Sequence, residues 1–435
     1  MTWNMDTASY INNVLTIAGS DSGGGAGIQA DVKTITALGN YGMTIITAIT
    51  AQNTLGVSDY MPVPLDMIQK QFDAVASDIP IHAAKTGMLA SSEIVALVAS
   101  NIKKYSIPYT VVDPVMVAKG GSTLLSHDAI SAVINLLLPV AHVVTPNLHE
   151  AEVLTGLTIQ TIDDMKKVAK QIHSSGARYV VIKGGHLNDS ADDVIYDGND
   201  YTILQGTKIN TQNTHGTGCT FSAAIAAYLA NGYNAIEAIA KAKAFITKAI
   251  QFSLPLGKGH GPTNHLVDIV NNNYKEEVIH EVEQAFSVIQ AAQCGDILVS
   301  GSSNIGYALP YPINQTDFAL FPGGIITHQD SVFKIKDAAC NVEHPLADMM
   351  QKIKGNYRTA ISIKNSNAIR AIAHAMDVPV IQVTAPDELM NTGFDKSQIM
   401  IVVDDDPLLY IAGQNPLDVA QIVVSIKRRL HEYTS

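Results

Sequence analysis

Along residues 14–265, short segments of apolar residues alternate with longer segments in which hydrophobic and polar residues follow a helical pattern. Short apolar runs rich in β-branched residues, typical of buried strands, occur at residues 14–18, 44–50, 110–112, 142–144 and 179–182. Stretches with helical periodicity lie between them, at residues 29–37, 93–104, 128–138 and 163–173. Residues 194–204 interrupt this rhythm with a predicted hairpin. Strands that alternate with helices indicate βαβ units, so we predict a mostly parallel sheet flanked by helices.

The rhythm stops at a cluster of glycine and proline, residues 257–262, and a helical pattern resumes at residue 276. We therefore predict a first domain over residues 1–265, a linker over 266–275 and a second, smaller α/β domain over 276–435. The second domain has strand-like runs at residues 296–299, 319–321, 324–327, 359–363, 380–383 and 399–403. Its predicted helices are residues 345–353, 366–376 and 416–431.

Composition narrows the class of protein. Of the 435 residues, 47% are hydrophobic and 16% charged, which is enough for large cores and excludes a mainly disordered chain. The net charge of −12 argues against a general nucleic-acid or membrane-surface binder, because these need an excess of Lys and Arg. Three widely separated cysteines predict no disulfide framework. The sequence has no apolar leader and no membrane span, so we expect a cytoplasmic protein. We also expect it to form a homo-oligomer and to act on small molecules.

The strongest local signal is the segment Thr214-His215-Gly216-Thr217-Gly218-Cys219, which opens an alanine-rich helical pattern. Glycines at a helix N-terminus expose backbone N–H groups, and these groups together with the helix dipole attract anions. A cysteine in the first turn lies in the same field, which favours its thiolate. We predict that the loop holds a phosphoryl group while Cys219 takes a proton from an attacking hydroxyl. In the alternative interpretation, the glycines only cap a packed helix and Cys219 is a small core residue.

Polar groups also follow several predicted strands, where ligands collect in a parallel sheet. A glycine-rich turn at residues 19–27 has neither the spacing of a dinucleotide-binding fingerprint nor the ending of a P-loop. Gln52 can both donate to and accept from an aminopyrimidine edge. Asn147 and Glu150 lie one helical turn apart and could hold a hydrated Mg²⁺, to which Asp113 could add a carboxylate. Lys183 offers a cation to a nucleotide phosphate. Taken singly, each of these residues could equally be turn chemistry, a helix cap or a solvated charge.

The order of the motifs carries a family resemblance. They are GSDSGGGAGIQAD, AQNT, KTGM, DPVM, TPNLHE, KGGH and NTHGTGC, spread over residues 14–265. In this respect the chain resembles the hydroxymethylpyrimidine/phosphomethylpyrimidine kinase of thiamine biosynthesis, a member of the ribokinase-like superfamily. The resemblance implies ATP, Mg²⁺ and two successive phosphorylations, first of the hydroxymethyl group and then of the monophosphate. A kinase for another vitamin-like alcohol, such as pyridoxal, is the alternative on the same scaffold.

Residue roles follow from the same resemblance. Gly216 and Gly218 would form the anion hole beside Cys219, the base. The substrate pocket would be formed by Gly25, Asp31, Gln52, Met88 and Val115. The nucleotide and metal side would be formed by Asp113, Asn147, Glu150, Lys183 and Thr217.

Residues from about 275 onward resemble the ThiN-type thiamine-phosphate synthase domain. The likeness lies in GSSNIGYALP, FPGGII and the helix entry near His344, so we expect Ser303, Asn304, Gly323 and His344 to form its site. The family usually has an arginine where this chain has Gly324, and arginine is the natural bidentate clamp for phosphate. Lys334, Lys336 or Arg358 could compensate. The second domain is therefore either a working synthase with an altered anion site or a non-catalytic sensor of thiamine phosphates.

Overall fold

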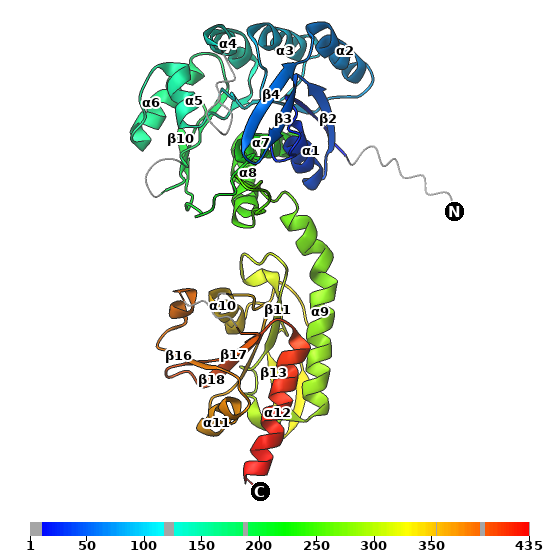
Figure 1. Cartoon of the computed structure of the whole chain (residues 1–435), viewed down its shortest axis with the longest axis vertical. Coiled ribbons are helices and arrows are strands. Elements are labelled where there is room, and N and C mark those ends of the chain that lie inside the picture. Colours follow the sequence, from blue (N-terminus) through cyan, green and yellow to red (C-terminus); the bar gives the residue numbers. More distant parts are fainter. Residues whose placement is uncertain (1–10, 117–125, 186–189, 354, 392–395, 435) are drawn as a thin grey trace, which may run out of the picture. The chain divides into compact units, whose positions relative to one another are not determined.

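The protein forms two compact units, Met1–Val267 and Asp268–Ser435 (Figure 1). The computed structural model describes residues 11–116, 126–185, 190–353, 355–391 and 396–434. His186, the last residue of the KGGH motif, lies outside them. Within the described residues, no helix is both long and apolar enough to span a membrane.

The first unit is built on an eight-stranded sheet with the order β10-β9-β8-β7-β6-β5-β1-β2. Strands β2, β1, β5, β6, β7 and β8 are parallel, whereas β9 and β10 are antiparallel and form the hairpin expected from the sequence. Strands β3 and β4 pair separately. The strands are β1 (Asn13–Ala18), β2 (Tyr41–Ile46), β3 (Ala48–Asn53), β4 (Gly56–Pro62), β5 (Ala83–Thr86), β6 (Thr110–Val112), β7 (Val143–Val144), β8 (Tyr179–Ile182), β9 (Asp193–Tyr196) and β10 (Tyr201–Leu204).

Helices cover both faces of this sheet, which explains why its central strands are apolar on both sides. One core packs side chains of helices α2 to α6 against the sheet, and the other packs α1, α7 and α8. The helices are α1 (Gly27–Ala37), α2 (Leu65–Ala76), α3 (Ser92–Lys104), α4 (His127–Ala132), α5 (Leu148–Thr155), α6 (Ile162–His173), α7 (Thr217–Ala230) and α8 (Ala235–Gln251). The small residues of α7 bury nearly the whole helix.

The second unit has a six-stranded sheet with the order β12-β11-β15-β18-β17-β16, in which only β16 and β17 are parallel. Helices α9, α11 and α12 pack into one core, and α10 packs into another. The strands are β11 (Ile305–Ala308), β12 (Phe318–Ala319), β13 (Ile325–His328), β14 (Ser331–Lys334), β15 (Thr359–Lys364), β16 (Val380–Val383), β17 (Gln398–Val403) and β18 (Leu408–Gly413). The helices are α9 (Val267–Ala291), α10 (Pro345–Lys352), α11 (Asn367–Ala375) and α12 (Pro416–Thr434).

Three segments differ from the elements expected from the sequence. Residues 44–50 are not one strand, because Thr47 lies between β2 and β3, which belong to different sheets. Residues 296–299 are not a strand; a 3-10 helix at Cys294–Ile297 includes the first two of them. The segment expected as a linker, 266–275, is helical from Val267 onward as the start of α9. Short apolar and polar runs alone do not distinguish these conformations.

Candidate active site

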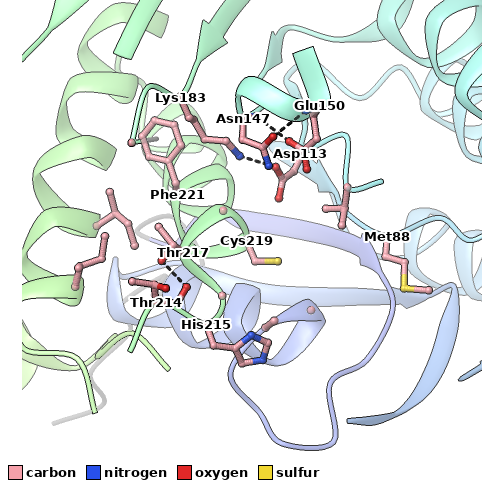
Figure 2. A pocket seen from close by; sticks show the side chains of 18 of the residues that line it. Met88, Asp113, Asn147, Glu150, Lys183, Thr214, His215, Thr217, Cys219 and Phe221 are labelled. Carbon is pink, nitrogen blue, oxygen red and sulfur yellow. Dashed lines mark hydrogen bonds and ion pairs between the residues drawn. The ribbon is translucent and has the colours of Figure 1, made fainter. Parts of the chain in front are cut away.

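A cavity of about 650 Å³ lies in the first unit, where the parallel strands end and α7 begins. Most residues expected from the sequence to form the site line it: Gln52, Met88, Asp113, Val115, Asn147, Glu150, Lys183, Gly216, Thr217, Gly218 and Cys219. Because consecutive parallel strands end at the same edge of the sheet, their terminal residues meet although they are far apart in the sequence. Figure 2 shows Lys183, Asp113 and Cys219 around this space.

The N-cap and first turn of α7 offer backbone donors beside the cavity. Gly216 is the N-cap of α7 with φ +79°, and a Cβ built there would lie 1.8 Å from the carbonyl oxygen of Gly25. Only glycine fits such a position. Among the described residues, the N–H groups of Gly218 and Cys219 have no hydrogen-bond acceptor, as expected for the first turn of a helix. The turn is therefore able to bind an anion.

The titration of Cys219 is the reverse of the expectation. Burial raises the pKa of the thiol to about 11, although the Lys85 ammonium and the Gly27 amide act in the opposite direction. The sequence-based prediction of a favoured thiolate considered the helix N-terminus alone. Desolvation outweighs that field here, so Cys219 is a neutral thiol at neutral pH.

A charged group lies on one side of Cys219. The Lys183 ammonium and the Asp113 carboxylate form an ion pair at 3.1 Å, and both side chains are largely buried. Asn147 and Glu150 form a reciprocal capping box at the start of α5, each side chain bonding the other residue's N–H at 2.8 Å. Burial raises the pKa of Glu150 to about 7, and the nearby Lys183 opposes this.

This group has the oxygen donors that Mg²⁺ prefers. No cluster of three or more His, Cys, Asp or Glu side chains able to hold a metal occurs within the described residues. Mg²⁺ is commonly held by one or two carboxylates together with water and phosphate oxygens. In Glu150 the capping box engages Oε2 and not Oε1. Asp113 and Glu150 therefore fit a Mg²⁺ ion that is bound largely by a nucleotide.

Two residues predicted to line the substrate pocket do not line the cavity. Asp31 is fully buried; its carboxylate binds the Lys85 ammonium at 2.9 Å and accepts a hydrogen bond from Thr16 Oγ1 at 2.6 Å. Gly25 packs beneath the His215 ring, since a Cβ there would lie 2.4 Å from its Cδ2. Lys85 lines the cavity instead. The signal for Lys85 in the sequence was a lysine within an apolar strand.

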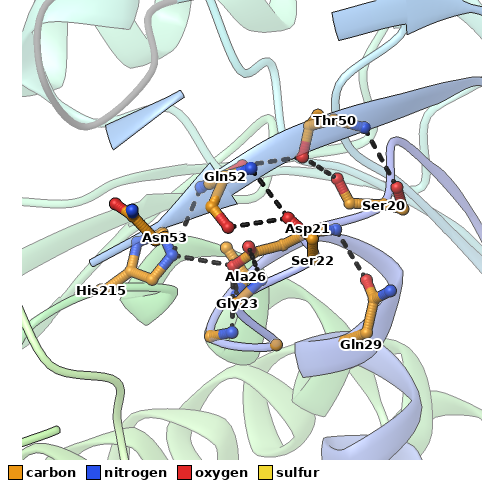
Figure 3. A network of polar contacts seen from close by, with 12 residues as sticks. Ser20, Asp21, Ser22, Gly23, Ala26, Gln29, Thr50, Gln52, Asn53 and His215 are labelled. Carbon is orange, nitrogen blue, oxygen red and sulfur yellow. Dashed lines mark hydrogen bonds and ion pairs between the residues drawn. The ribbon is translucent and has the colours of Figure 1, made fainter. Parts of the chain in front are cut away.

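A buried polar pair that was not predicted from the sequence lies beside Gln52. His215 Nε2 lies 2.9 Å from Asp21 Oδ2 and 3.3 Å from Gln52 Nε2 (Figure 3). Asp21 accepts further hydrogen bonds from the N–H groups of Gly23, Gly25 and Ala26. The pKa of Asp21 is lowered: hydrogen bonding to His215 and Ala26 outweighs desolvation, the largest single effect. Both residues belong to motifs already noted, so their motif membership could have identified them.

The other end of the cavity is partly apolar. Phe221 of α7 and Ile246 and Ile250 of α8 line it, and Lys243 of α8 pairs with Asp193 of β9 at 2.7 Å. A flat heterocycle with polar edges fits such a lining. No strand-end motif marked these residues, and the only sequence signal was the amphipathic pattern of α8.

In the second unit, the predicted site residues hold the local backbone together. Asn304 is fully buried; its side chain donates to the Phe321 carbonyl oxygen at 2.9 Å and accepts from the Phe321 N–H at 3.2 Å. Ser303 Oγ accepts from the Val299 N–H at 2.9 Å. His344 is the N-cap of α10 and accepts from the Leu346 N–H at 3.1 Å. Gly323 has φ +80°.

Gly324 cannot be replaced by a longer residue without strain. Its φ is +73°, and a Cβ would lie 2.6 Å from the carbonyl oxygen of Gly301. An arginine therefore does not fit this turn. Of the cations considered as substitutes, Lys334 pairs with Asp337 at 2.9 Å and with Glu283. Arg358 donates to the Ala308 carbonyl oxygen at 2.7 Å and stacks on the Tyr307 ring.

Comparison with known proteins identifies the family. Residues 21–264 match the family described as phosphomethylpyrimidine kinase. The chain belongs to this family. Residues 281–425 match the family described as thiamine-phosphate synthase ThiN. These matches confirm the fusion of the two domains that the sequence motifs predicted.

Individual relatives cover mainly the kinase part. The hydroxymethylpyrimidine/phosphomethylpyrimidine kinase of Bacillus subtilis is 48% identical over 257 residues, which cover 59% of this chain and 95% of that protein. The thiamine biosynthesis bifunctional protein ThiED of Geobacter sulfurreducens is 52% identical over 257 residues, but this chain spans only 52% of its length. The solved ADP complex of Bacillus subtilis pyridoxal kinase is 46% identical with a TM-score of 0.56, covering 59% of this chain and 98% of that one. The neighbours confirm the predicted ribokinase-like α/β fold.

Proposed function

We propose that the first unit transfers phosphate from ATP to 4-amino-5-hydroxymethyl-2-methylpyrimidine and then to the resulting monophosphate. The observation that supports this proposal most strongly is that Gln52 lines the same cavity as Gly218 and Cys219, whose N–H groups in the first turn of α7 have no acceptor among the described residues. A pyrimidine bound at Gln52 has its hydroxymethyl group near Cys219, and a phosphate at the turn of α7 accepts its attack. The family membership supports the same chemistry.

The proposed roles follow from the contacts. The N–H groups of Gly218 and Cys219 stabilise the negative charge on the transferred phosphoryl group. Lys183 adds a cation, and Asp113 with Glu150 would hold Mg²⁺, which would supply further positive charge against that of the phosphates. Cys219 receives the proton of the hydroxyl as the new O–P bond forms. Because burial raises the pKa of Cys219 to about 11, only the small thiolate fraction can accept this proton, and the neighbouring Lys85 ammonium favours that form.

We further propose where the nucleotide binds and how the chain assembles. ATP places its base at the end of the cavity lined by Phe221, Ile246 and Ile250, with Thr217 near its phosphates. A cytoplasmic location and a homo-oligomeric state also belong to the proposal. Sedimentation analysis of the purified chain measures the oligomeric state.

For the second unit, we propose condensation of the pyrimidine diphosphate with thiazole phosphate to give thiamine phosphate. The match to the ThiN family supports it. A non-catalytic sensor of thiamine phosphates is the second candidate, and the closed turn at Gly324 favours it, because this turn has no room for an arginine clamp. Supplying the intact chain with synthetic pyrimidine diphosphate and thiazole phosphate, without ATP, separates the two. Thiamine phosphate indicates a synthase, whereas tight binding without product indicates a sensor.

The experiment that tests the kinase proposal is the product set from hydroxymethylpyrimidine, ATP and Mg²⁺. We expect the monophosphate first and the diphosphate afterwards. Pyridoxal is the matched alternative substrate, because a solved pyridoxal kinase is 46% identical to this chain. Faster turnover of pyridoxal than of the pyrimidine would reassign the first unit.

A further inference from the structure

The amide of Gln52 lies between two groups that can be identified as one donor and one acceptor. Its Nε2 is 3.3 Å from His215 Nε2, and its Oε1 is 3.3 Å from Thr50 Oγ1 (Figure 3). The nitrogen and oxygen of a side-chain amide are assigned from their hydrogen-bond partners. The partners of His215 and Thr50 therefore decide which end of the amide faces which residue.

On one side, His215 must be a donor. Its Nε2 lies 2.9 Å from Asp21 Oδ2, and this oxygen also accepts from the N–H groups of Gly25 at 3.0 Å and Ala26 at 2.8 Å. Asp21 is 1% exposed and its pKa is lowered, so it is an ionised carboxylate that only accepts hydrogen bonds. His215 Nε2 therefore has its hydrogen, whether the ring is neutral or protonated. Gln52 can therefore only share this hydrogen as a second acceptor, because an amide N–H at this place would face another N–H group.

On the other side, Thr50 must be an acceptor. Its single hydroxyl hydrogen is donated to the Ser20 carbonyl oxygen at 2.8 Å, and a carbonyl oxygen cannot donate. Only lone pairs of Thr50 Oγ1 remain for the Gln52 amide. The neighbouring atom of Gln52 has to be a donor, and this requirement is independent of the one at His215.

Both requirements are met when the Gln52 amide is turned by half a turn, with Oε1 at His215 and Nε2 at Thr50. We infer that Asp21, His215, Thr50 and Ser20 fix the direction of this amide and so determine the specificity of the pocket. The inference rests on the proposed kinase function. The main chain of Gln52 is also held, since its N–H donates to Ser22 Oγ at 2.8 Å and its carbonyl oxygen accepts from Ser22 Oγ at 2.7 Å.

The fixed amide presents one lone pair of Oε1 and one N–H of Nε2 to the cavity. This pair is complementary to the edge of a 4-aminopyrimidine, which offers an amino N–H beside a ring nitrogen acceptor, as Gln pairs with adenine. Because the acceptor end lies at His215, the ring can bind in only one direction along this edge. Asp21 and His215 are thus positioning residues that act on the substrate through Gln52.

The test uses two substrates of nearly equal shape with opposite edges. These are the 4-amino-5-hydroxymethyl-2-methylpyrimidine and its 4-oxo analogue, which has a carbonyl acceptor beside a ring N–H donor. We expect the intact wild-type chain to favour the amino compound at least about 100-fold in kcat/KM, because the oxo edge leaves buried polar groups unpaired. Thr50→Val and His215→Leu each release one end of the amide. In both variants we expect this ratio to fall about tenfold, with an absolute gain for the oxo analogue.

Thr50→Ser is the matched control, since it keeps the hydroxyl and should keep the wild-type ratio. A general loosening of the pocket would lower kcat/KM for both substrates and leave no gain for the oxo analogue. An unchanged ratio in both releasing variants, with the amino compound still phosphorylated, would overturn the inference alone. Failure of the wild type to phosphorylate the amino compound would overturn the proposed function and the inference together. A neutron structure showing deuterons of the Gln52 amide at His215 instead of Thr50 would also contradict it.

Discussion

The glycine- and polar-rich motifs of the two units have similar residue types but different uses. In the first unit, the turn at Gly216 leaves the N–H groups of Gly218 and Cys219 directed at a cavity. In the second unit, Ser303 and Asn304 form hydrogen bonds with the surrounding backbone, and Gly324 is enclosed by the Gly301 carbonyl oxygen. A motif of this kind therefore forms a binding site only where its N–H and side-chain groups are not already bonded to neighbouring parts of the fold.

The sharpest test of this difference is Cys219→Ala. We expect kcat for pyrimidine phosphorylation to fall at least about 100-fold with little change in KM, because a proton acceptor is removed from the transition state. Steady-state kinetics with ATP in excess measures both constants. Cys340→Ala, at a half-buried thiol of the second unit, is the matched control. Unchanged turnover in the Cys219 variant would remove this residue from the mechanism.

The second test concerns the enclosed turn of the other unit. Gly324→Ala should lower the free energy of unfolding of that unit by about 3 kcal/mol, since it adds a close contact with a carbonyl oxygen to a left-handed backbone conformation. Gly323→Ala is the matched control and should cost about 1 kcal/mol, because its Cβ meets only the flexible end of Ile335 at 3.0 Å. Calorimetric unfolding of the full chain reports both values. Equal costs would show that the turn is open.

Lys183→Met should weaken the interaction of the first unit with the phosphates of ATP. We expect kcat/KM for ATP to fall about tenfold, because a cation facing phosphate is lost and Asp113 loses its partner. The matched control is Lys427→Met, which removes the ion pair with Asp296 in the second unit. A fall confined to the pyrimidine KM would move Lys183 to the substrate side.

A pH effect of several-fold is expected from Glu150. Because burial raises its pKa to about 7, kcat/KM for ATP should decline as the pH falls below about 7, where the carboxylate is neutralised. In Glu150→Gln this inflection should disappear. The free energy of unfolding changes with pH in the opposite direction. The pKa of Glu150 is about 7 in the folded state and 4.5 in the unfolded state, so the folded state holds this proton more tightly. Its contribution to stability is therefore greatest in acid and is lost as the pH rises through about 7. An unchanged pH profile in the variant would exclude this carboxylate from the metal site.

The smallest effect is expected at His344. His344→Ala removes an N-cap and should cost about 1 kcal/mol in the second unit, without affecting kinase turnover. Thermal unfolding measures the loss, and His344→Asn, another capping side chain, should restore most of it. Loss of thiamine phosphate synthesis at unchanged stability in the alanine variant would instead make His344 a site residue.

The sequence predicted the structure correctly where a residue type by itself determines the local backbone or the burial of a segment. Gly216 and Gly218 predicted backbone N–H groups exposed at a helix N-terminus, and the apolar strands predicted a parallel sheet whose ends gather the motifs. It misled at Asp31, where the spacing of a motif residue did not reveal that the side chain is used by Lys85. It also misled at Cys219, because desolvation depends on neighbours that are distant in the sequence.

By itself, the sequence determined the family and the alternation of strands and helices, and most of the site residues that it predicted for the first unit line the cavity. Only the tertiary structure decided which of these residues keep a free functional group. Asp21 and His215 are separated by 194 positions, yet together they fix the amide of Gln52. The physical reason is that burial, charge pairing and hydrogen-bond partners are set by contacts in space, whereas a sequence motif specifies only the local backbone and the chemistry on offer.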